Sequence, residues 1–231
     1  MKQYRPRLNK QQNKLVQQSG RLIIGDLHAP FIRKGYLDHC KRIRDRYNCD
    51  DVIFTGDIID NHYSSFHDTD PSGHGGAKEL DLAKEEIQKW YKEFPKAKVC
   101  KGNHDLIPQR KLFSAGVTEH WIKNIGDVLE TPNWEYSESF IIDDILYCHG
   151  TGRKARQRAK NDLISVVQGH YHSESYVTFY VGQNYKIFAM QIGCGVDDKA
   201  YAMAYGKNFA KNHINCGVII NGNPILEYMK L

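Results

Sequence analysis

Short apolar runs alternate with amphipathic segments along the first hundred residues of the chain. The runs over 21–26, 51–57 and 97–102 are brief and nearly continuous, which is typical of strands buried on both faces. Between them, 35–47 and 77–94 place apolar residues at helical spacing. The pattern therefore predicts a strand–helix–strand–helix–strand order for this half of the protein.

The rest of the chain is dominated by strand-like runs. Strands are predicted over 139–148, 163–168, 176–181, 185–192 and 214–229. Asn221-Gly222 lies inside the last run and is a strong hairpin-turn signal. A mostly helical stretch is expected over 107–130, and the polar, turn-rich residues 61–76 form a long loop. This order predicts a layered α/β protein with either one mixed sheet or two sheets face to face.

Length and composition predict a single globular domain. The chain has 231 residues, of which 41% are hydrophobic and 26% are charged. Residues 1–19 are rich in Gln, Lys, Arg and Asn, so we expect a flexible basic N-terminal arm followed by a single domain over 20–231. No apolar run approaches the roughly 18 residues of a membrane helix, and the start lacks the apolar core of a secretory signal. We therefore expect no membrane span and a cytoplasmic location.

Charge and cysteine content narrow the classes of partner and metal site. The net charge of +5 mildly favours anionic partners, which include phosphoesters, nucleic acid and acidic protein. The six cysteines form no C-x-x-C pair, so a zinc ribbon and a disulfide scaffold are both disfavoured. Cys148 is a candidate metal ligand because it adjoins His149. Strand alternation, however, predicts that the two side chains point in opposite directions.

Side chains that bind metals follow the apolar runs, usually directly after a glycine. Asp26 and His28 are separated by one residue, and His170 and His172 repeat this spacing. In extended backbone, such i, i+2 pairs fall on the same side and can hold one ion. Further candidates stand alone at the ends of other runs: Asp57, Asn103 and His149. Because sites form outside the carboxyl ends of strands in open α/β sheets, these side chains are expected to meet.

The donor set predicts the kind of metal and the number of ions. A mixture of oxygen and nitrogen ligands suits Mn²⁺ first, with Fe, Zn²⁺ or Ni²⁺ as alternatives, better than it suits Ca²⁺ or Mg²⁺. Two adjacent ions need a shared anionic ligand, and Asp57 is the natural bridge because it follows the middle of the three N-terminal strands. Taken singly, each residue fits an ordinary turn or surface position. Their joint occurrence is what favours a two-metal centre.

Five motifs carry a resemblance to a known family. They read GDLH (25–28), GDIID (56–60), GNHD (102–105), HG (149–150) and GHYH (169–172). In this order they resemble the motifs of the calcineurin-like metallophosphoesterases, in particular small stand-alone phage and bacterial members. The resemblance implies an α/β fold, a four-layer α/β/β/α sandwich with two mixed sheets flanked by helices. It also implies hydrolysis of a phosphoester at a dinuclear centre.

The resemblance also implies a role for each motif residue. The first ion would be held by Asp26, His28 and His172, and the second by Asn103, His149 and His170, with Asp57 bridging both. His104 would be a catalytic group near the leaving oxygen, with Asp105 orienting it. Asp60 is expected to be structural.

The expected chemistry follows from these roles. A water between two divalent ions is acidified towards hydroxide near neutral pH and attacks phosphorus in line. The ions offset charge on the phosphoryl oxygens. His104 would protonate the departing alkoxide, since an imidazole is suited to proton transfer at neutral pH.

Departures from the phosphoprotein phosphatase branch bear on the substrate. That branch typically reads GDxHG, GDxxDRG and GNHE, whereas this chain has Ala29, Asn61-His62 and Asp105 at the differing positions. The missing arginine grips phosphate in that branch. A Ser/Thr protein phosphatase of that type is therefore disfavoured.

Other residues are candidates for substrate contact. Asn61, His62 and Arg110 are the first choices, and His62 is preferred over His67 and His74 of the same loop. A surface position fits each of these histidines equally well. The segment 153–160, RKARQRAK, has five cations in eight residues. A helix there could present them to a phosphate backbone, although a solvated basic helix is the simpler interpretation.

The sequence thus predicts a metal-dependent phosphoesterase, either a phosphodiesterase or a phosphatase. A DNA or RNA nuclease of the same fold and a non-catalytic metal-binding scaffold are the alternatives. The predicted partner is a phosphoester substrate, with nucleic acid as one form of it, and no oligomeric state is predicted.

Overall fold

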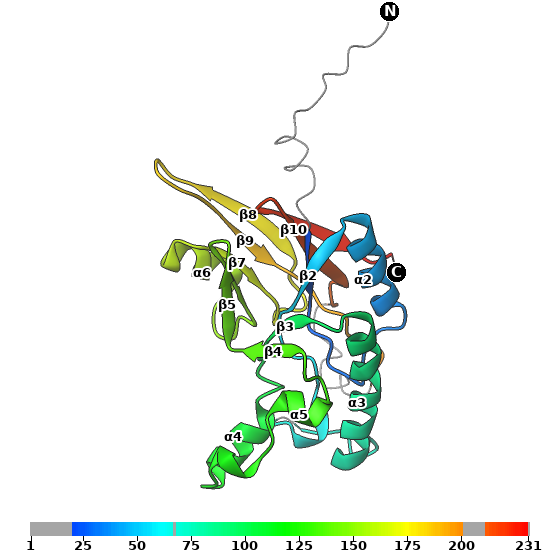
Figure 1. Ribbon diagram of the computed structural model, residues 1–231. Coiled ribbons are helices and arrows are strands. Elements are labelled where there is room, and N and C mark those ends of the chain that lie inside the picture. Colours follow the sequence, from blue (N-terminus) through cyan, green and yellow to red (C-terminus); the bar gives the residue numbers. More distant parts are fainter. Residues whose placement is uncertain (1–19, 67, 201–210, 231) are drawn as a thin grey trace, which may run out of the picture.

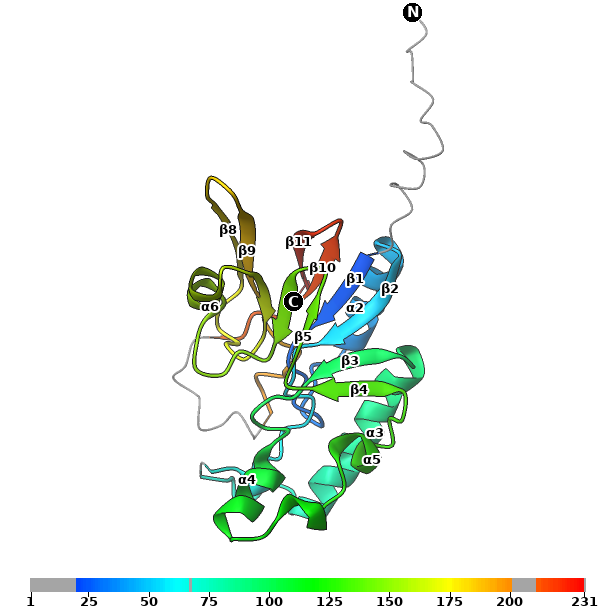
Figure 2. The ribbon, with the colours of Figure 1, turned by 60° about the vertical axis from the view of Figure 1, so that its left-hand side comes forward.

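Two β-sheets with helices outside them form the body of the protein (Figures 1 and 2). The computed structural model describes residues 20–66, 68–200 and 211–230. The basic arm expected over 1–19 lies outside the described residues, and so does His67. Within the described part, no helix combines the length and the apolar character needed to cross a membrane.

The first sheet has six described strands in the order β11-β10-β1-β2-β3-β4. They are β1 (Gly20–Ile24), β2 (Cys49–Phe54), β3 (Ala97–Cys100), β4 (Trp134–Ser137), β10 (Asn215–Ile220) and β11 (Asn223–Tyr228). Strands β1 to β4 run parallel, whereas β10 pairs antiparallel with β1 and β11. Because β2 lies between β1 and β3, the loop that follows it leaves the sheet between the loops of its two neighbours.

The second sheet has five described strands in the order β5-β6-β7-β9-β8. They are β5 (Ser139–Ile142), β6 (Ile145–Cys148), β7 (Ser165–Gln168), β8 (Tyr176–Val181) and β9 (Lys186–Gln191). Strands β6, β7 and β9 are parallel, and antiparallel hairpin partners β5 and β8 form the two edges. Both sheets are therefore mixed, as predicted.

Three separate apolar clusters define four layers. The largest joins α2 (Tyr36–Arg46) and α3 (Gly76–Glu93) to the outer face of the first sheet. A second lies between the sheets and includes Ile23, Ile53 and Met190. A third packs α6 (Ala155–Asp162) on the outer face of the second sheet. The order helix, sheet, sheet, helix confirms the predicted α/β/β/α sandwich.

The long helix α3 shows why the helical spacing was a reliable signal. Its buried face carries Ala83, Ile87 and Trp90, and Phe94 caps its end just before Pro95. Trp90 is 1% exposed, and its ring packs against three aromatic neighbours. The centroid distances are 5.7 Å to Tyr36 and 6.0 Å to both Phe54 and Phe94.

Several elements differ from the sequence prediction. The stretch 107–130 is broken into α4 (Ile107–Ser114), a 3₁₀ turn η2 (Glu119–Trp121) and α5 (Ile125–Leu129). The expected single strand over 139–148 is the β5–β6 hairpin, whose turn residues Asp143 and Asp144 have left-handed φ values of 52° and 59°. Strand β4 was not predicted because its four residues give too short a pattern.

The C-terminal hairpin is confirmed, since β10 and β11 pair around Asn221 and Gly222. Their φ values of 49° and 73° are those of a type I′ turn. The described residues of the loop expected over 61–76 are largely irregular, with one 3₁₀ turn, η1 (His62–Ser64), and Gly76 already belongs to α3.

We expect Trp90→Ala to lower the free energy of unfolding by about 3–5 kcal/mol, because it removes a buried indole and leaves a cavity. Chemical denaturation monitored by circular dichroism measures this. Trp121→Ala is the matched control, since Trp121 is 81% exposed and should cost little. Equal losses for the two variants would contradict the assignment of Trp90 to the core.

Candidate metal centre

Loops after five strands converge at one edge of the sandwich. Asp26 and His28 follow β1, Asp57 follows β2, Asn103 and His104 follow β3, His149 follows β6, and His170 and His172 follow β7. All five strands belong to parallel pairs, so their carboxyl ends point the same way. The candidate ligands from both sheets are thereby brought together.

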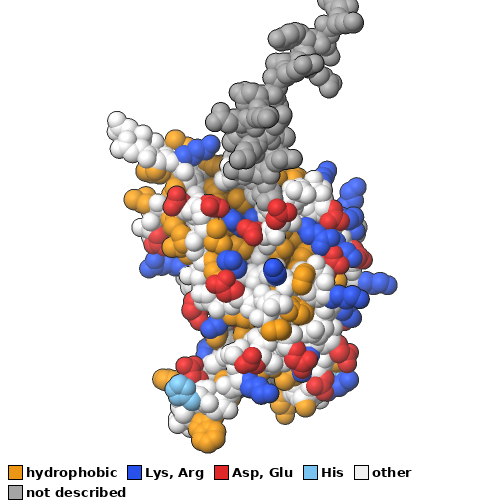
Figure 3. Space-filling view, viewed as in Figure 1, with side chains coloured by type: hydrophobic (Ala, Val, Ile, Leu, Met, Phe, Trp, Pro, Cys, Tyr) orange, Lys and Arg blue, Asp and Glu red, His pale blue; other side chains and the backbone are white. Residues whose placement is uncertain are grey.

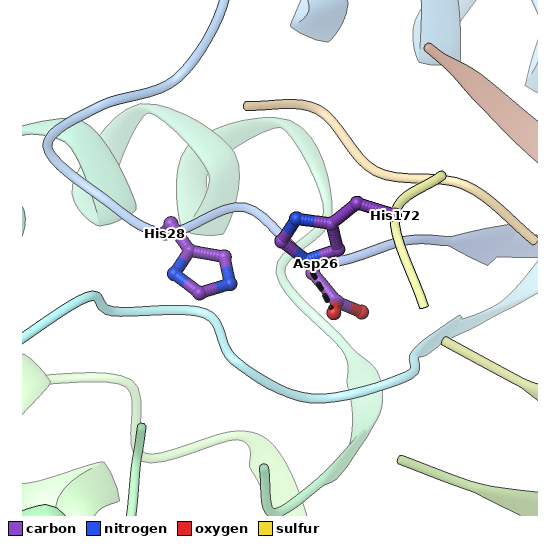
Figure 4. Close-up of side chains that lie close together, drawn as sticks. All are labelled: Asp26, His28 and His172. Atoms are coloured by element: carbon purple, nitrogen blue, oxygen red, sulfur yellow. Dashed lines mark hydrogen bonds and ion pairs between the residues drawn. The ribbon is translucent and has the colours of Figure 1, made fainter. Parts of the chain in front are cut away.

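One group consists of Asp26, His28 and His172, whose candidate ligand atoms lie within 4.8 Å of one another (Figure 4). The Nε2 atom of His172 lies 3.0 Å from Oδ2 of Asp26. The rings of His28 and His172 meet edge to face at a centroid distance of 5.0 Å. Asp26 is fully buried and His28 is 2% exposed. The Asp26–His28 pair that the sequence spacing suggested is therefore in one group, whereas His172 is separated from its sequence partner His170.

A second group consists of Asp57, His149 and His170, again within 4.8 Å. Nε2 of His149 lies 3.1 Å from Oδ2 of Asp57, 3.0 Å from Nδ1 of His170 and 2.9 Å from Oδ1 of Asn103. The other three residues expected to hold the second ion thus surround the Nε2 atom of His149.

Asp57 lies between the two groups. Its Oδ2 atom is 3.6 Å from Nε2 of His28 and 3.1 Å from Nε2 of His149. Its Oδ1 atom accepts a hydrogen bond from the backbone N–H of His104 at 2.8 Å. The carboxylate is 2% exposed. One oxygen therefore faces both sets of imidazole nitrogens, which is the placement that a bridging ligand requires.

Hydrogen bonds fix which nitrogen of each histidine faces the cluster. Nδ1 of His149 lies 3.0 Å from the carbonyl oxygen of Thr55, which can only accept, so Nδ1 carries the proton. Nδ1 of His28 lies 2.5 Å from Oδ1 of Asp60. In both residues the Nε2 atom is left to point at Asp57. Such outer partners are typical of metal-binding histidines.

The donor atoms fit divalent ions. Nε2 of His28 is buried and has no hydrogen-bond partner among the described residues. Two imidazole nitrogens, those of His149 and His170, face each other at 3.0 Å. Ligand atoms at right angles around one ion would be about 3.0 Å apart, given bonds of about 2.1 Å. These separations are close to that value, so the residues present suit the metals expected from the sequence.

A family model described as Calcineurin-like phosphoesterase matches residues 21–192, which is most of the chain and contains all five motifs. The chain belongs to the calcineurin-like phosphoesterases. The family resemblance inferred from the motifs is confirmed, and with it the prediction of a metal-dependent phosphoesterase.

One solved structure supports the fold, and two others show a weaker similarity. A metallophosphoesterase from Sphaerobacter thermophilus is 14% identical, with a TM-score of 0.51 over 92% of this chain and 88% of that chain. Vacuolar Protein Sorting 29 from Cryptosporidium parvum is 12% identical, with a TM-score of 0.47 over 91% and 96% of the two chains. The nuclease MPE from Pseudomonas putida is 13% identical, with a TM-score of 0.40 over 90% and 87%. No curated protein sequence matches the chain.

The electrostatics of this calcineurin-like phosphoesterase reflect the crowding of its carboxylates. Burial raises the pKa of Asp57, but the charge and hydrogen bond of His149, together with His28 and His104, outweigh burial and hold that pKa well below its usual range. Burial lowers the pKa of His149, yet Asp57 and Asp26 together raise it to about 9. Burial lowers the pKa of His28, and His104 lowers it further, which favours the neutral ligand form. Without metal, the carboxylates are thus balanced by protons on histidine.

His104 lies next to the first group. Its ring meets that of His28 at a centroid distance of 4.5 Å, and its Nδ1 atom lies 2.6 Å from the carbonyl oxygen of Asp60. Because a carbonyl only accepts, Nδ1 carries the proton and Nε2 is left for a substrate or an ion. Asp60 therefore contacts both His28 and His104, which agrees with its expected structural role.

The expected contact between Asp105 and the ring of His104 is not found among the hydrogen bonds of the described residues. Asp105 is 2% exposed, and its carboxylate accepts backbone N–H groups instead. Oδ1 accepts from Ile58 and Ile59 at 3.0 and 3.2 Å, and Oδ2 accepts from Gly102 at 2.8 Å. Burial, with a further contribution from Asp57, raises the pKa of Asp105 to about 7. Asp105 ties the loops after β2 and β3 together, and Asp60 positions the ring of His104.

The three candidates for substrate contact have different surroundings. Asn61 is partly exposed and donates from Nδ2 to the carbonyl oxygen of His104 at 2.9 Å. Arg110 is exposed on α4, and its guanidinium lies 4.5 Å above the ring of Phe66. Both stay candidates for substrate contact.

The described surroundings of His62 favour a structural role over substrate contact. It is 5% exposed, Nε2 accepts from the backbone N–H of Asp70 at 3.1 Å, and Nδ1 lies 4.0 Å from Asp60. These contacts fit a side chain that braces the loop after η1 rather than one that faces substrate. His74 is exposed in the same loop.

Sequence reasoning missed two supporting residues. Glu79 of α3 is 3% exposed and accepts the backbone N–H groups of His62 and Tyr63 at 2.6 and 3.1 Å. It thereby fixes the loop that follows Asp60. Thr55 accepts from His149 through its carbonyl and lies 3.4 Å from Oδ1 of Asp26 through its hydroxyl. Neither has a sequence signal, since a glutamate in an amphipathic helix usually faces water and a threonine fits any strand.

Close backbone packing explains two of the glycines that precede candidate ligands. A Cβ atom on Gly102 would lie 2.0 Å from Oδ1 of Asp57, and one on Gly169 would lie 2.2 Å from Oδ1 of Asp26. A side chain at either position would displace a carboxylate. The ligand geometry therefore depends on residues that supply no ligand atom.

We expect Gly102→Ala and Gly169→Ala each to weaken Mn²⁺ binding by about tenfold or more, because each methyl group displaces a buried carboxylate. Isothermal titration calorimetry measures the affinity. Gly75→Ala is the control, since a Cβ there meets nothing within 4 Å and its φ of −69° is ordinary. Unchanged affinity in both site variants, with the fold intact by circular dichroism, would contradict the proposed carboxylate ligands.

Proposed function

We propose that this calcineurin-like phosphoesterase hydrolyses a phosphodiester or phosphomonoester at a dinuclear centre, with His104 as the proton donor. The observation that carries the proposal is the position of Asp57. One carboxylate oxygen lies within 3.6 Å of ligand nitrogens from both groups. Two ligand groups that share one carboxylate are suited to two adjacent ions rather than to one.

The assignment of ligands follows the two groups. Asp26, His28 and His172 would hold one ion, and Asn103, His149 and His170 the other, with Asp57 shared. When bound, two divalent ions lower the pKa of a shared water and offset the charge on the phosphoryl oxygens. Mn²⁺ is our first choice for this mixed oxygen and nitrogen set, and Fe, Zn²⁺ or Ni²⁺ are the alternatives.

His104 is suited to act on the leaving group. Its Nδ1–H donates a hydrogen bond to the carbonyl oxygen of Asp60, so a proton given to the leaving oxygen would come from Nε2. The ring is 19% exposed, in contrast to the nearly buried rings of His28 and His149, so substrate can reach it. The backbone N–H of His104 also donates to Asp57, which links its position to the shared carboxylate.

The same geometry bears on two alternatives, namely that His104 is a metal ligand and that the protein is a non-catalytic scaffold. His28, Asp57 and His104 also lie within ligand distance of one another, so His104 has a competing role as a ligand. A non-catalytic scaffold would need the ligands but not a proton donor beside them. The presence of His104 next to a complete ligand set favours the enzyme. We also keep the sequence-based prediction of a cytoplasmic location.

We expect His104→Ala to keep both ions and to lower kcat by about 10²–10⁴, the usual contribution of a general acid. The loss should be larger for an alkyl phosphodiester than for bis-p-nitrophenyl phosphate, because p-nitrophenolate leaves without protonation. Steady-state kinetics and metal content by atomic emission are the measurements. Loss of an ion with recovery of activity on added Mn²⁺ would show that His104 is a ligand.

We expect Asp57→Asn to bind less than two ions per chain and to lose activity on every phosphoester, because the shared ligand loses its charge. Activity is measured with Mn²⁺ on bis-p-nitrophenyl phosphate and p-nitrophenyl phosphate side by side. Asp68→Asn serves as the control for removing a carboxylate, since Asp68 is exposed in the loop after η1. Full activity of Asp57→Asn would refute a shared-carboxylate centre, and an inactive but metal-loaded native protein would favour the scaffold.

A further inference from the structure

The basic segment 153–160 is folded against the second sheet as helix α6. Ala155 and Ala159 are fully buried and face the sheet, whereas four of the five cations, Arg153, Lys154, Arg156 and Lys160, are exposed. Lys and Arg side chains are visible at the left edge of the molecule, near α6 (Figure 3). The segment contains five cations and no acidic residue. A cationic surface is therefore built into this side of the protein.

Three of these cations lie on aromatic rings. The Nζ atom of Lys154 is 5.7 Å from the ring centre of Tyr171, and that of Lys160 is 5.1 Å from Tyr180. The guanidinium of Arg156 lies 3.8 Å above Tyr176. We refer to these six residues as the cation–tyrosine strip: Lys154, Arg156, Lys160, Tyr171, Tyr176 and Tyr180. Stacking holds each cation in place while its N–H groups stay available for an anion.

The strip begins at the metal centre. Tyr171 lies between the candidate ligands His170 and His172, and its ring meets that of His170 at 4.7 Å. On the other side, α6 follows His149 by a short loop, in which the hydroxyl of Thr151 lies 3.5 Å from Oδ1 of Asn103. Both connections lead to the ligand group that contains Asp57, His149 and His170. A chain bound along the strip would therefore extend from the metal centre.

Charge along the strip is only partly neutralised by the protein. Lys154 forms an ion pair with Glu174. Arg156 donates through Nε to the neutral hydroxyl of Thr178 at 2.9 Å, in addition to its stacking on Tyr176. From Arg156 to Lys160 the helix rises about 6 Å. Two cations at this spacing on one face suit an anion with repeated charges better than a single phosphate.

We propose that the cation–tyrosine strip binds the backbone of single-stranded nucleic acid and leads it to the metal centre, so that its phosphodiesters are the substrate. The inference rests on the proposed function, which supplies the hydrolysis. Water adds to phosphorus, the P–O bond to one sugar breaks, and a proton ends on the departing sugar oxygen. A positively charged track with aromatic side chains is the usual means of holding a flexible single strand.

The first test is binding without hydrolysis. Fluorescein-labelled oligothymidylate is titrated with the full chain in EDTA, and anisotropy gives Kd. We expect Arg156→Ala/Lys160→Ala to raise Kd about tenfold or more and to reduce the slope of log K against log salt by about 1.4, at roughly 0.7 per lost phosphate contact. The control Lys89→Ala/Lys92→Ala removes the same charge from exposed positions on α3 and should bind as the native chain does.

Three outcomes would overturn the inference. They are native affinity in the strip variant, an equal loss in the α3 control, and competition by polyglutamate as strong as that by unlabelled oligothymidylate. The last would identify a surface for acidic protein instead. Thermal melts of both double variants show that they are folded.

The second test separates this inference from the proposed function. With Mn²⁺, the strip variant should lose at least about tenfold more kcat/KM on the oligonucleotide than on bis-p-nitrophenyl phosphate, because only the polymer reaches along α6. If the native protein hydrolyses neither compound, the proposed function fails. The binding titration still tests whether the cation–tyrosine strip binds nucleic acid. If the strip variant loses both activities equally, the strip does not select the substrate.

Discussion

Two carboxylates, Asp26 and Asp57, are buried at one edge of the sandwich, and the rest of the site depends on offsetting their charge. Burying a carboxylate is costly unless it is paired or binds a metal. Here the surrounding imidazoles share the task, and the pKa shifts of Asp57 and His149 in opposite directions record it. The parallel strands bring these groups together because their carboxyl ends share one direction. A pair of divalent ions would meet the same electrostatic demand more completely than protons do.

Backbone hydrogen bonds, rather than side-chain packing, set the position of the ligands. The carbonyl of Asp57 accepts from Leu27 and His28 at 3.0 and 2.9 Å, which joins the loops after β1 and β2. Asp105 joins the loops after β2 and β3 through three N–H groups. Several of the residues so held have left-handed backbone: His28, Asp57, Asn61 and His170, with φ between 47° and 72°. Such conformations are costly for residues other than glycine and are concentrated at functional sites.

The sequence was sufficient to predict which residues would meet, but not how each would be held. Strand-end position and i, i+2 spacing are local properties, and they placed Asp26 beside His28. His170 and His172 repeat the spacing but lie in different groups, a division that only the family resemblance implied. The partner of a side chain across the fold is not local. Asp105 therefore received a role near His104, although its oxygens face the backbone of Ile58 and Gly102. The same limit applies to His62, which is buried although its loop is polar, and to the short strand β4.

Helix α6 packs on the sheet through two buried alanines, whereas Arg156 and Lys160 on the same helix are exposed. Amino-acid changes at its outward positions would therefore leave the sandwich and the ligand loops intact. If the strip binds nucleic acid as we propose, its preference among polymers can diverge in evolution through changes on this helix alone, with the ligand loops inherited unchanged.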